Sequence, residues 1–220
     1  MKKYLAKPIK YETSSKMILD YHYSHRTPQV IYSFGLYEDD LLVGCITYGR
    51  PATPQVAKSV YPDNTSIVYE LNRLVILTNS PNAASFLVGN SLKQMQDGLI
   101  IVSYADRAFG HVGYIYQATN FYYAGEVKAH DSEYIWNGKK YHPRVLNHMG
   151  INNPVQWATE VGAEKLPTIS KYRYIYITGN QRQRNIILNG IKWQLNKDYP
   201  KGNTTRHETT IKETQTGLGI

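Results

Sequence analysis

Four short groups of polar and aromatic residues in this sequence have the types and spacing to carry out acid–base chemistry. The first is the YHYSH segment from Tyr21 to His25, in which two histidines stand three residues apart. On a shared helix surface, such a pair can bind one metal ion, contact one phosphate or relay a proton. The alternative is a helix end at which His25 faces the negative end of the helix dipole. One histidine pair is a weak indication of a metal site.

The second group is Glu70-Leu71-Asn72-Arg73, inside an otherwise apolar stretch. Polar residues in a central strand cost free energy unless they are paired or face a cleft. Strict alternation along a strand predicts Glu70 and Asn72 on one face and Arg73 on the other, where it would meet a ligand. A structural ion-pair network is the equally weighted alternative, because buried ion pairs serve either purpose.

The third and fourth groups follow an apolar run at 99–102. Ser103-Tyr104-Ala105-Asp106 ends that run, and ligands gather at the carboxyl ends of parallel strands, so Asp106 is predicted to act as an acid or base. The alternative is that Asp106 caps the next helix. In the fourth group, Tyr114 and Tyr116 are two residues apart on a short helix and therefore point to different sides. One of them can line a site, although a purely aromatic core helix is the alternative.

Strands and helices predicted from periodicity and turn signals place these groups. Ile31–Tyr37 and Leu41–Tyr48 form a hairpin across an acidic turn, and Asn137-Gly138 predicts a second hairpin with a type I′ turn. Further strands are expected at 1–10, 67–76, 99–102, 121–125 and 172–177, and helices from Thr13 or Ser14 to 23–25, at 79–96, at 112–119 and at 180–193. Residues 49–66 are expected to form a long loop.

The size and composition indicate one α/β domain. With 220 residues, the chain is long enough for one core, predicted over 1–199 with an insertion at about 127–170 and a polar, flexible tail at 200–220. Lys and Arg number 25 against 17 Asp and Glu, which leaves a net charge of +8 and favours a polyanionic partner such as nucleic acid or an anionic membrane. The 20 tyrosines strengthen that prediction, because aromatic rings beside cations can stack on bases.

The cysteine count and the absence of long apolar stretches bear on the compartment. Cys45 is the one cysteine, which excludes an intrachain disulfide framework and a cysteine-rich zinc site. Cys45 lies in an apolar run and is predicted to fill the core. Since no apolar stretch has the length to cross a bilayer, we expect no membrane association and a cytoplasmic location in whatever host makes the protein.

The four groups, in this order and at these spacings, resemble the Mom family of phage DNA-modifying proteins. The shared elements are HYS, ELNR, S-aromatic-A-D, IY-x-A-x-x-F and a late aromatic strand at 172–176; the resemblance covers about 15–178. It implies a GNAT-like fold, with a mixed, mostly antiparallel central sheet and helices on both faces. It also implies an enzyme that converts the N6 amine of adenine in duplex phage DNA to an acetamido or carbamoylmethyl-type amide, which protects the DNA from host restriction.

The resemblance implies a set of site residues and two cofactors. Iron is one candidate, and acetyl-CoA or another acyl donor is the second. His22 and Asp106 are of the types that bind iron through nitrogen and oxygen, and a third ligand would have to come from His25, His111 or a tyrosine. The junction at 78–83 lacks the Q/R-x-x-G-x-G/A loop with which GNAT enzymes hold the CoA pyrophosphate, so a bare helix N-terminus would have to bind the phosphate. The catalytic set is His22, Tyr23, Arg73, Ser103, Asp106 and Tyr116, and the donor-binding set is Asn82, Ala83, Ala84 and Ser85.

Within that set, each side chain suits a step of amine transfer. Asp106 is predicted to remove the proton, Tyr23 or Tyr116 to stack on the base or donate a proton, and Arg73 to hold a carbonyl or phosphate of the donor. His22 would bind metal or shuttle protons. Because N6 is paired in a duplex, the adenine is expected to be flipped out. Basic residues predicted to hold the DNA backbone are Lys139, Lys140, Arg144, Arg182, Arg184 and Lys192.

Two other functions remain open. One is a conventional GNAT N-acetyltransferase that acts on a small amine, and the other is a non-catalytic, basic DNA-binding protein. An adenine methyltransferase would need a Pro-Pro-aromatic tetrapeptide, which Asn153-Pro154-Val155-Gln156 resembles poorly, and a zinc deaminase would need paired cysteines.

Overall fold

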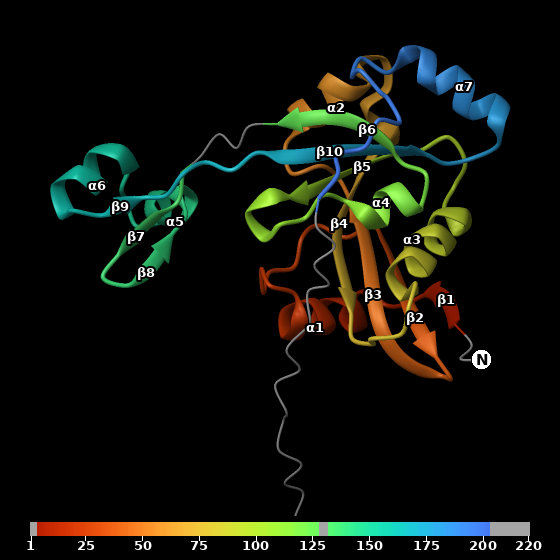
Figure 1. Cartoon of the computed structure of the whole chain (residues 1–220), viewed down its shortest axis with the longest axis horizontal. Helices are drawn as coiled ribbons and strands as arrows, with labels where there is room; N and C mark the ends of the chain where they lie inside the picture. The colour runs from red at the N-terminus through yellow and green to blue at the C-terminus, as the bar shows by residue number, and fades with distance from the viewer. Residues whose placement is uncertain (1–3, 128–131, 203–220) are drawn as a thin grey trace, which may run out of the picture.

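A seven-stranded sheet forms the centre of the protein in the computed structural model, which describes residues 4–127 and 132–202 (Figure 1). The strand order is β1-β2-β3-β4-β5-β10-β6, and β4–β5 is the one parallel pair in this sheet of the described residues. The strands are β1 (Tyr4–Pro8), β2 (Tyr32–Glu38), β3 (Leu41–Gly49), β4 (Val68–Ile76), β5 (Ile100–Asp106), β6 (Tyr122–Val127) and β10 (Lys171–Ile177).

Helices cover both faces of this sheet, so the predicted GNAT-like, mostly antiparallel fold is confirmed. On one face, α3 (Ala83–Gln94) and α4 (Tyr114–Ala118) pack on the largest apolar cluster, which includes Leu87, Ile101 and Tyr174. On the other face, α2 (Pro54–Val60) and α7 (Gln181–Gly190) cover β5 and β10, and α1 (Tyr11–Tyr21) covers β3. Two short 3₁₀ turns, η1 (Pro62–Ile67) and η2 (Arg107–Phe109), complete this domain.

A small lobe stands off one edge of the main sheet (Figure 1). It contains β7 (Tyr134–Trp136), β8 (Lys139–Tyr141) and β9 (Glu164–Lys165) in the order β8-β7-β9, together with α5 (Pro143–His148) and α6 (Pro154–Val161). Its core is small, with Tyr134, Leu146 and Ala158 as the buried residues. The lobe falls within the insertion predicted at 127–170, between strands β6 and β10.

The central strands β4 and β5 diverge after a short stretch of pairing, and we call this point of divergence the opening. Only Val68–Glu70 of β4 pair with β5, where their partners are Ile100–Val102. Beyond these residues β4 continues along β3, whereas β5 continues along β10. Backbone groups and side chains at the point of divergence therefore have no neighbouring strand on one side and can face a ligand.

Most predicted elements are present, with three corrections. Both hairpins are confirmed, and Asn137 and Gly138 have the positive φ values, +48° and +71°, of the predicted I′ turn. The expected loop at 49–66 instead contains α2 and most of η1, because Pro54 stands in the first turn of a helix. α1 ends at Tyr21, before the histidines, and starts at Tyr11 without a side-chain cap. The tail predicted to be flexible lies largely outside the described residues.

Within the described residues, none of the helices has the length and apolarity to cross a membrane.

Candidate active site

The segment after α1 carries His22 and Tyr23 to the opening between β4 and β5. The prediction that His22 and His25 share a helix surface is wrong, since the helix ends at Tyr21 and His22 has extended backbone angles. His25 instead caps α1, because its Nδ1 lies 2.7 Å from the Leu19 carbonyl oxygen. His22 is 8% exposed, and its ring lies 4.3 Å from the ring of Tyr23.

The environment of His22 keeps its imidazole neutral near pH 7. Burial first, and then the nearby charges of Arg73 and His25, lower the pKa of His22 to about 4. The backbone N–H of Ser24 donates to Nδ1 of His22 at 3.1 Å. A neutral ring that accepts at Nδ1 carries its proton at Nε2, so His22 presents a donor there.

This lowered pKa predicts a specific loss of stability in acid. Between pH 6.5 and about 4, the unfolded chain protonates His22 and the folded chain does not, so acid favours unfolding. We expect the parent protein to lose about 1 to 2 kcal/mol more unfolding free energy between pH 7 and pH 5 than His22→Asn, in which an amide oxygen replaces Nδ1 as the acceptor. Urea unfolding at both pH values measures this, and equal losses would contradict the assignment.

A β-bulge in β4 positions Asn72 and Arg73. The register of β3 with β4 shifts between the pairs Thr47–Arg73 and Tyr48–Leu71, so Asn72 is an extra residue. Leu71 and Leu74 both pack on the α3 side, which places Asn72 and Arg73 together on the opposite face with Glu70. The strict alternation predicted from the sequence, with Arg73 facing away from Glu70, is therefore wrong.

The two bulge residues tie the segment after α1 to the sheet. The Asn72 amide donates to the Gln29 carbonyl at 3.0 Å and accepts from Thr47 at 2.6 Å. Arg73 Nε donates to the Arg26 carbonyl at 3.3 Å. Gln29 also lies against Gly49, where a Cβ atom would be 1.9 Å from the Gln29 carbonyl oxygen. Asn72 is thus structural, and Arg73 both holds this segment and lies in the opening.

Glu70 is the carboxylate at the point where β4 and β5 separate. Its Oε2 accepts from the Ala52 backbone N–H at 3.2 Å, and none of the ion pairs within 4.0 Å among the described residues includes it. Burial raises the pKa of Glu70, while the Ala52 hydrogen bond and the charges of Arg73 and Lys171 lower it. A carboxylate with a raised pKa is a stronger base than an exposed one.

Asp106, at the end of β5, is held by two partners. Its Oδ1 accepts from the Ala108 backbone N–H at 3.0 Å, so Asp106 does cap the following turn, as the alternative interpretation proposed. Its Oδ2 lies 2.7 Å from Nζ of Lys171, and the Asp106 side chain is 17% exposed. Lys171 begins β10 and pairs with Asp106 across the sheet. Both oxygens of Asp106 therefore have a donor.

Tyrosines approach the opening from both sides. Tyr116 packs against Phe121 and Tyr174, and burial raises its pKa to about 12, although a hydrogen bond with Ser103 lowers it. Ser103 is 1% exposed, and its hydroxyl faces the Leu71 carbonyl at 3.4 Å. On the other side, burial followed by Glu70 raises the pKa of Tyr104 to about 12. All of these hydroxyl groups stay protonated at neutral pH and can donate.

Electrostatic interactions link Tyr23 to three of the other predicted catalytic residues, Arg73, Asp106 and Tyr116. Tyr23 is 58% exposed. Partial burial and the charge of Asp106 raise the pKa of Tyr23, while Lys171 and Arg73 lower it. Tyr23 and Glu70 in turn raise the pKa of Tyr116. His22 interacts electrostatically with Arg73, whereas Ser103 forms a hydrogen bond with Tyr116, which packs in the apolar cluster on the α3 side of the sheet.

The sequence did not assign Lys171 or Tyr104 to the site, and it left Glu70 undecided. Lys171 could have been found from the antiparallel arrangement of β5 and β10, since the first residue of one strand then meets the last residue of the other. The bulge that directs Glu70 and Arg73 to one face has no signal in the sequence.

The residues predicted to bind the donor lie at the N-terminus of α3, after β4. Asn82 has a positive φ of +63° and its side chain makes no capping bond, while Ala83 is 3% exposed. Ala84 and Ser85 are partly exposed, and the Ser85 hydroxyl donates to the Asn82 carbonyl at 3.1 Å. Backbone N–H groups of this first helical turn are the available donors for a phosphate.

The predicted iron ligands do not form a fitting donor set. Among residues 4–127 and 132–202 there is no group of three or more His, Cys, Asp or Glu side chains able to hold a metal ion. The Nδ1 atom of His22 accepts from Ser24, and Asp106 is held by Ala108 and Lys171. Iron therefore has no fitting set of ligands among the described residues.

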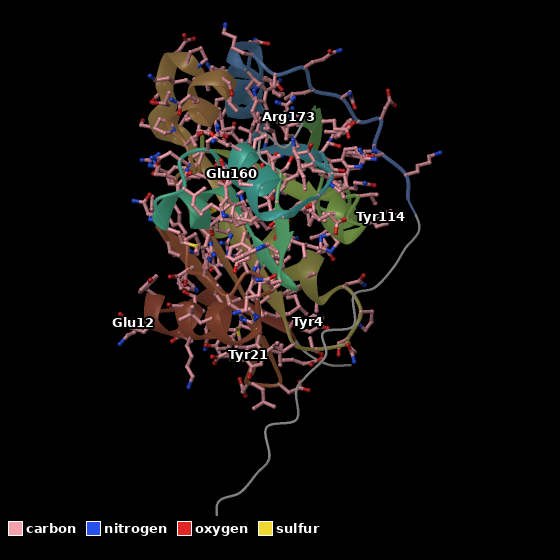
Figure 2. All side chains as sticks on the ribbon, turned by 90° about the vertical axis from the view of Figure 1, so that its left-hand side faces the viewer. Tyr4, Glu12, Tyr21, Tyr114, Glu160 and Arg173 are labelled. Atoms are coloured by element: carbon pink, nitrogen blue, oxygen red, sulfur yellow. The ribbon has the colours of Figure 1, made fainter. Side chains whose placement is uncertain are left out.

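The residues predicted to bind DNA occupy two separate places. Lys139 and Lys140 are on the lobe, and the segment that leaves the lobe continues into Lys171 at the start of β10. Arg182, Arg184 and Lys192 come after the other end of β10. The lobe faces the viewer in Figure 2, in which Glu160 of α6 is labelled in front of the main sheet. The side chain of Arg144 lies outside what the structure describes.

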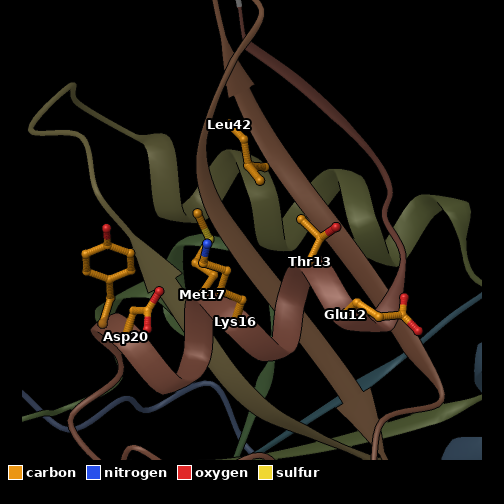
Figure 3. A pocket seen from close by; sticks show the side chains of 7 residues that line it. Glu12, Thr13, Lys16, Met17, Asp20 and Leu42 are labelled. Atoms are coloured by element: carbon orange, nitrogen blue, oxygen red, sulfur yellow. The ribbon is translucent and has the colours of Figure 1, made fainter. Parts of the chain in front are cut away.

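A hollow of about 430 Å³ lies elsewhere, between α1 and β3 (Figure 3). Lys16, Asp20 and Met17 are among its lining residues, so it is open, mixed in charge and partly apolar. None of the predicted catalytic residues lines it.

Comparisons with known proteins agree with the resemblance seen in the motifs. The chain is 28% identical over 217 residues to the methylcarbamoylase mom of Escherichia phage Mu, covering 90% of this chain and 86% of that protein. Two solved structures are similar to the chain at TM-scores below 0.5. One is Arabidopsis thaliana NAA60 in complex with acetyl-CoA, with 11% identity, a TM-score of 0.49 and coverage of 80% of this chain and 98% of that chain. The other is an N-acetyltransferase from Staphylococcus aureus Mu50, with 12% identity, a TM-score of 0.44 and coverage of 80% and 98%. A model of the Mom protein family matches residues 3–201, and the chain therefore belongs to that family.

Proposed function

We propose that this protein is a DNA-modifying transferase that attaches an acetamido or carbamoylmethyl-type group to the N6 amine of adenine in duplex DNA. The observation that carries the proposal is the bulge in β4, which directs Glu70 and Arg73 to one face of the strand where β4 separates from β5. Tyr23 interacts electrostatically with Arg73 from the segment after α1. Membership of the Mom family and the methylcarbamoylase name of the phage Mu relative support the type of group transferred. The net charge of +8 supports a polyanionic substrate.

The proposed step joins adenine N6 to an electrophilic carbon of the donor. The N6 lone pair forms the new N–C bond, the bond from that carbon to the leaving group breaks with its electron pair, and one N6 proton passes to a base on the enzyme. N6 is a weak nucleophile because its lone pair is delocalised into the ring, so removal of the proton is the contribution that the enzyme must make.

Glu70 is the better candidate for that base, and Asp106 the weaker one. The Glu70 carboxylate accepts one backbone hydrogen bond and has a raised pKa. The two partners of Asp106 hold its charge in place, and its pairing with Lys171 gives it a positioning role. Lys171 and Arg73 supply positive charge toward the departing group.

The tyrosines and His22 complete the proposed site. Tyr23 is exposed enough at the rim to stack on a flipped adenine, at a cost of unpairing of a few kcal/mol. The protonated hydroxyl of Tyr116 and the Nε2–H of His22 serve as donors to the carbonyl or the leaving group.

The donor is expected to differ from a tightly bound acetyl-CoA. Since the junction at 78–83 provides no glycine-rich loop, few backbone N–H groups can approach a pyrophosphate. We expect calorimetry to give a dissociation constant for acetyl-CoA weaker than about 100 μM, in the range of −5 kcal/mol or less favourable. Free adenosine 3′,5′-bisphosphate serves as the control for the nucleotide end alone. Low-micromolar affinity for acetyl-CoA would make it the donor.

Nucleoside mass spectrometry on DNA from cells that express the protein tests the proposed function. The expected result is deoxyadenosine with the added mass of the amide-bearing group, absent from cells that express Arg73→Ala. Unmodified nucleosides together with retained DNA binding would indicate a non-catalytic DNA-binding protein. Unmodified nucleosides together with acetylation of a small amine would indicate a conventional N-acetyltransferase.

A further inference from the structure

The β7–β8 hairpin of the small lobe is a candidate surface for the duplex that flanks the target base. Residues 134–142 contain two lysines and one histidine. Lys140 forms an exposed ion pair with Glu133, which directly precedes β7, so Lys139 is the first lysine that a phosphate would meet. The turn at Asn137 and Gly138 stands free, because a Cβ atom placed on Gly138 would meet nothing within 4 Å. Lys139 and Lys140 follow that turn, and both are exposed. This hairpin tip can therefore reach a partner without moving the lobe.

An aromatic cluster supports the hairpin. Trp157 of α6 contacts Tyr134 at 6.0 Å, Trp136 at 5.8 Å and Tyr141 at 5.9 Å between ring centroids. Tyr134 is buried, whereas Trp136 and Tyr141 remain partly exposed. Rigid aromatic rings beside exposed lysines suit a nucleic acid, because the lysines bind phosphates and the rings pack against sugars and bases.

The lobe is attached beside the candidate site. Both its connections leave from the neck, which we define as Glu126–Val127 of β6 and Ser170–Lys171 before and at the start of β10. Lys171 pairs with Val127 on one side and with Asp106 on the other. Arg107 donates to Glu126 and, at 2.6 Å, to Ser170, so it joins the two strands of the neck directly next to Asp106. A duplex held by the lobe would therefore pass near the opening.

The basic residues of α7 are placed less favourably. α7 follows the opposite end of β10, which is seven residues, or about 20 Å, from Lys171. One of its arginines is also engaged in the fold, since Arg184 donates to the Tyr176 hydroxyl at 2.9 Å and its Cζ lies 5.1 Å from that ring. Removing charge from α7 should accordingly matter less to a duplex at the site.

We propose that the β7–β8 hairpin, with Lys139 and Lys140 at its tip, is the surface that grips the duplex beside the modified adenine. This inference rests on the proposed function, because it names the surface that presents the substrate. It also divides the basic residues predicted from the sequence into a group that holds the DNA and a group that does not.

Salt-dependent binding of a fluorescent duplex of about 25 base pairs tests the proposal with three double variants that each remove two positive charges. Lys139→Ala/Lys140→Ala alters the tip. Arg182→Ala/Lys192→Ala, the α7 variant, alters α7 and the segment that directly follows it. Lys58→Ala/Lys93→Ala, at exposed positions of α2 and α3, controls for net charge. For the tip variant we expect affinity about tenfold lower at 0.1 M salt and a log–log salt slope smaller by about 1 to 2, since each lost phosphate contact removes about 0.9. The other two variants should change affinity less than about threefold.

Kinetics distinguish this proposal from the proposed function. The tip variant should raise KM for DNA about tenfold and keep kcat, because the opening between β4 and β5 is untouched. Tip binding equal to that of the charge control, or a larger loss in the α7 variant, would overturn the inference while leaving modification by the parent protein intact. If the parent neither modifies nor binds duplex DNA, the proposed function fails instead.

Discussion

Glu70→Gln is expected to abolish modification of adenine while the fold and duplex binding persist. The substitution keeps the volume and the acceptor for the Ala52 N–H but removes the group that we propose receives the N6 proton. Loss of a general base costs about 10² to 10⁴ in rate. Single-turnover modification of a synthetic duplex measures the rate, and thermal unfolding and fluorescence anisotropy check the fold and the binding.

Asp106→Asn provides the matched comparison. An asparagine oxygen can still accept from the Ala108 N–H, so the cap stays, but the ion pair with Lys171 is lost. We expect a loss of about tenfold in rate, as for misplacement of a neighbouring charge. The pH profile also differs: the parent should lose activity in acid as the base with the raised pKa takes up a proton, and Asp106→Asn should keep that acidic limb. The reverse ranking of the two variants would identify Asp106 as the base.

Gly49→Ala is expected to damage both stability and activity. The added methyl would lie 1.9 Å from the Gln29 carbonyl oxygen and 2.9 Å from the Asn72 amide nitrogen, and a backbone atom cannot move aside as a flexible side chain can. The segment that carries His22 and Tyr23 must then shift from its bonds to Asn72 and Arg73. We expect a loss of about 3 kcal/mol in unfolding free energy, at the upper end for overpacking, and modification at least tenfold slower.

Gly89→Ala is the control of opposite sign. Gly89 lies inside α3, and an added methyl would contact only a Thr119 methyl at 4.0 Å among the atoms nearest to it. Alanine in a helix interior reduces the freedom of the unfolded chain, so a gain of about 0.5 to 1 kcal/mol is expected. Chemical unfolding of both variants measures the contrast. Equal effects of the two substitutions would show that stability does not depend on the close approach of the Gln29 carbonyl to Gly49.

The local elements could be predicted from the sequence because local chemistry determines them. Asn137-Gly138 adopts the two left-handed conformations of its turn, and Asn180 with Gln183 forms a capping box at the start of α7, near the predicted boundary. Cys45 is fully buried, as its apolar surroundings predict. Tyr114 and Tyr116 do face different surroundings, since Tyr114 is 39% exposed and Tyr116 packs in the core.

The arrangement of the site depended on contacts between distant segments, which periodicity does not describe. The bulge at Asn72 arises where β4 leaves β5 and stays on β3, so no local pattern marks it. The Asp106–Lys171 pair requires the register of β10 against β5, across the whole lobe. His22 was placed on the helix because Met17, Ile18 and Tyr21 continue its periodicity, yet the chain turns away immediately after Tyr21.

The position of β10 between β5 and β6 sets an order for folding. The edge strand β6 is synthesised before β10, which is its partner in the sheet. β6 therefore cannot pair in the sheet until the chain beyond the lobe has been synthesised. The Ile100–Ile101–Val102 edge of β5 is left uncovered over the same interval, which spans about 70 residues of synthesis. At ribosomal rates of 5 to 20 residues per second this interval is about 4 to 14 s, during which an apolar strand edge is open to pairing with other chains. Truncation before residue 171 would make that exposure permanent, so chains that stop within the lobe should aggregate, whereas chains that continue through Ile177 can close the sheet.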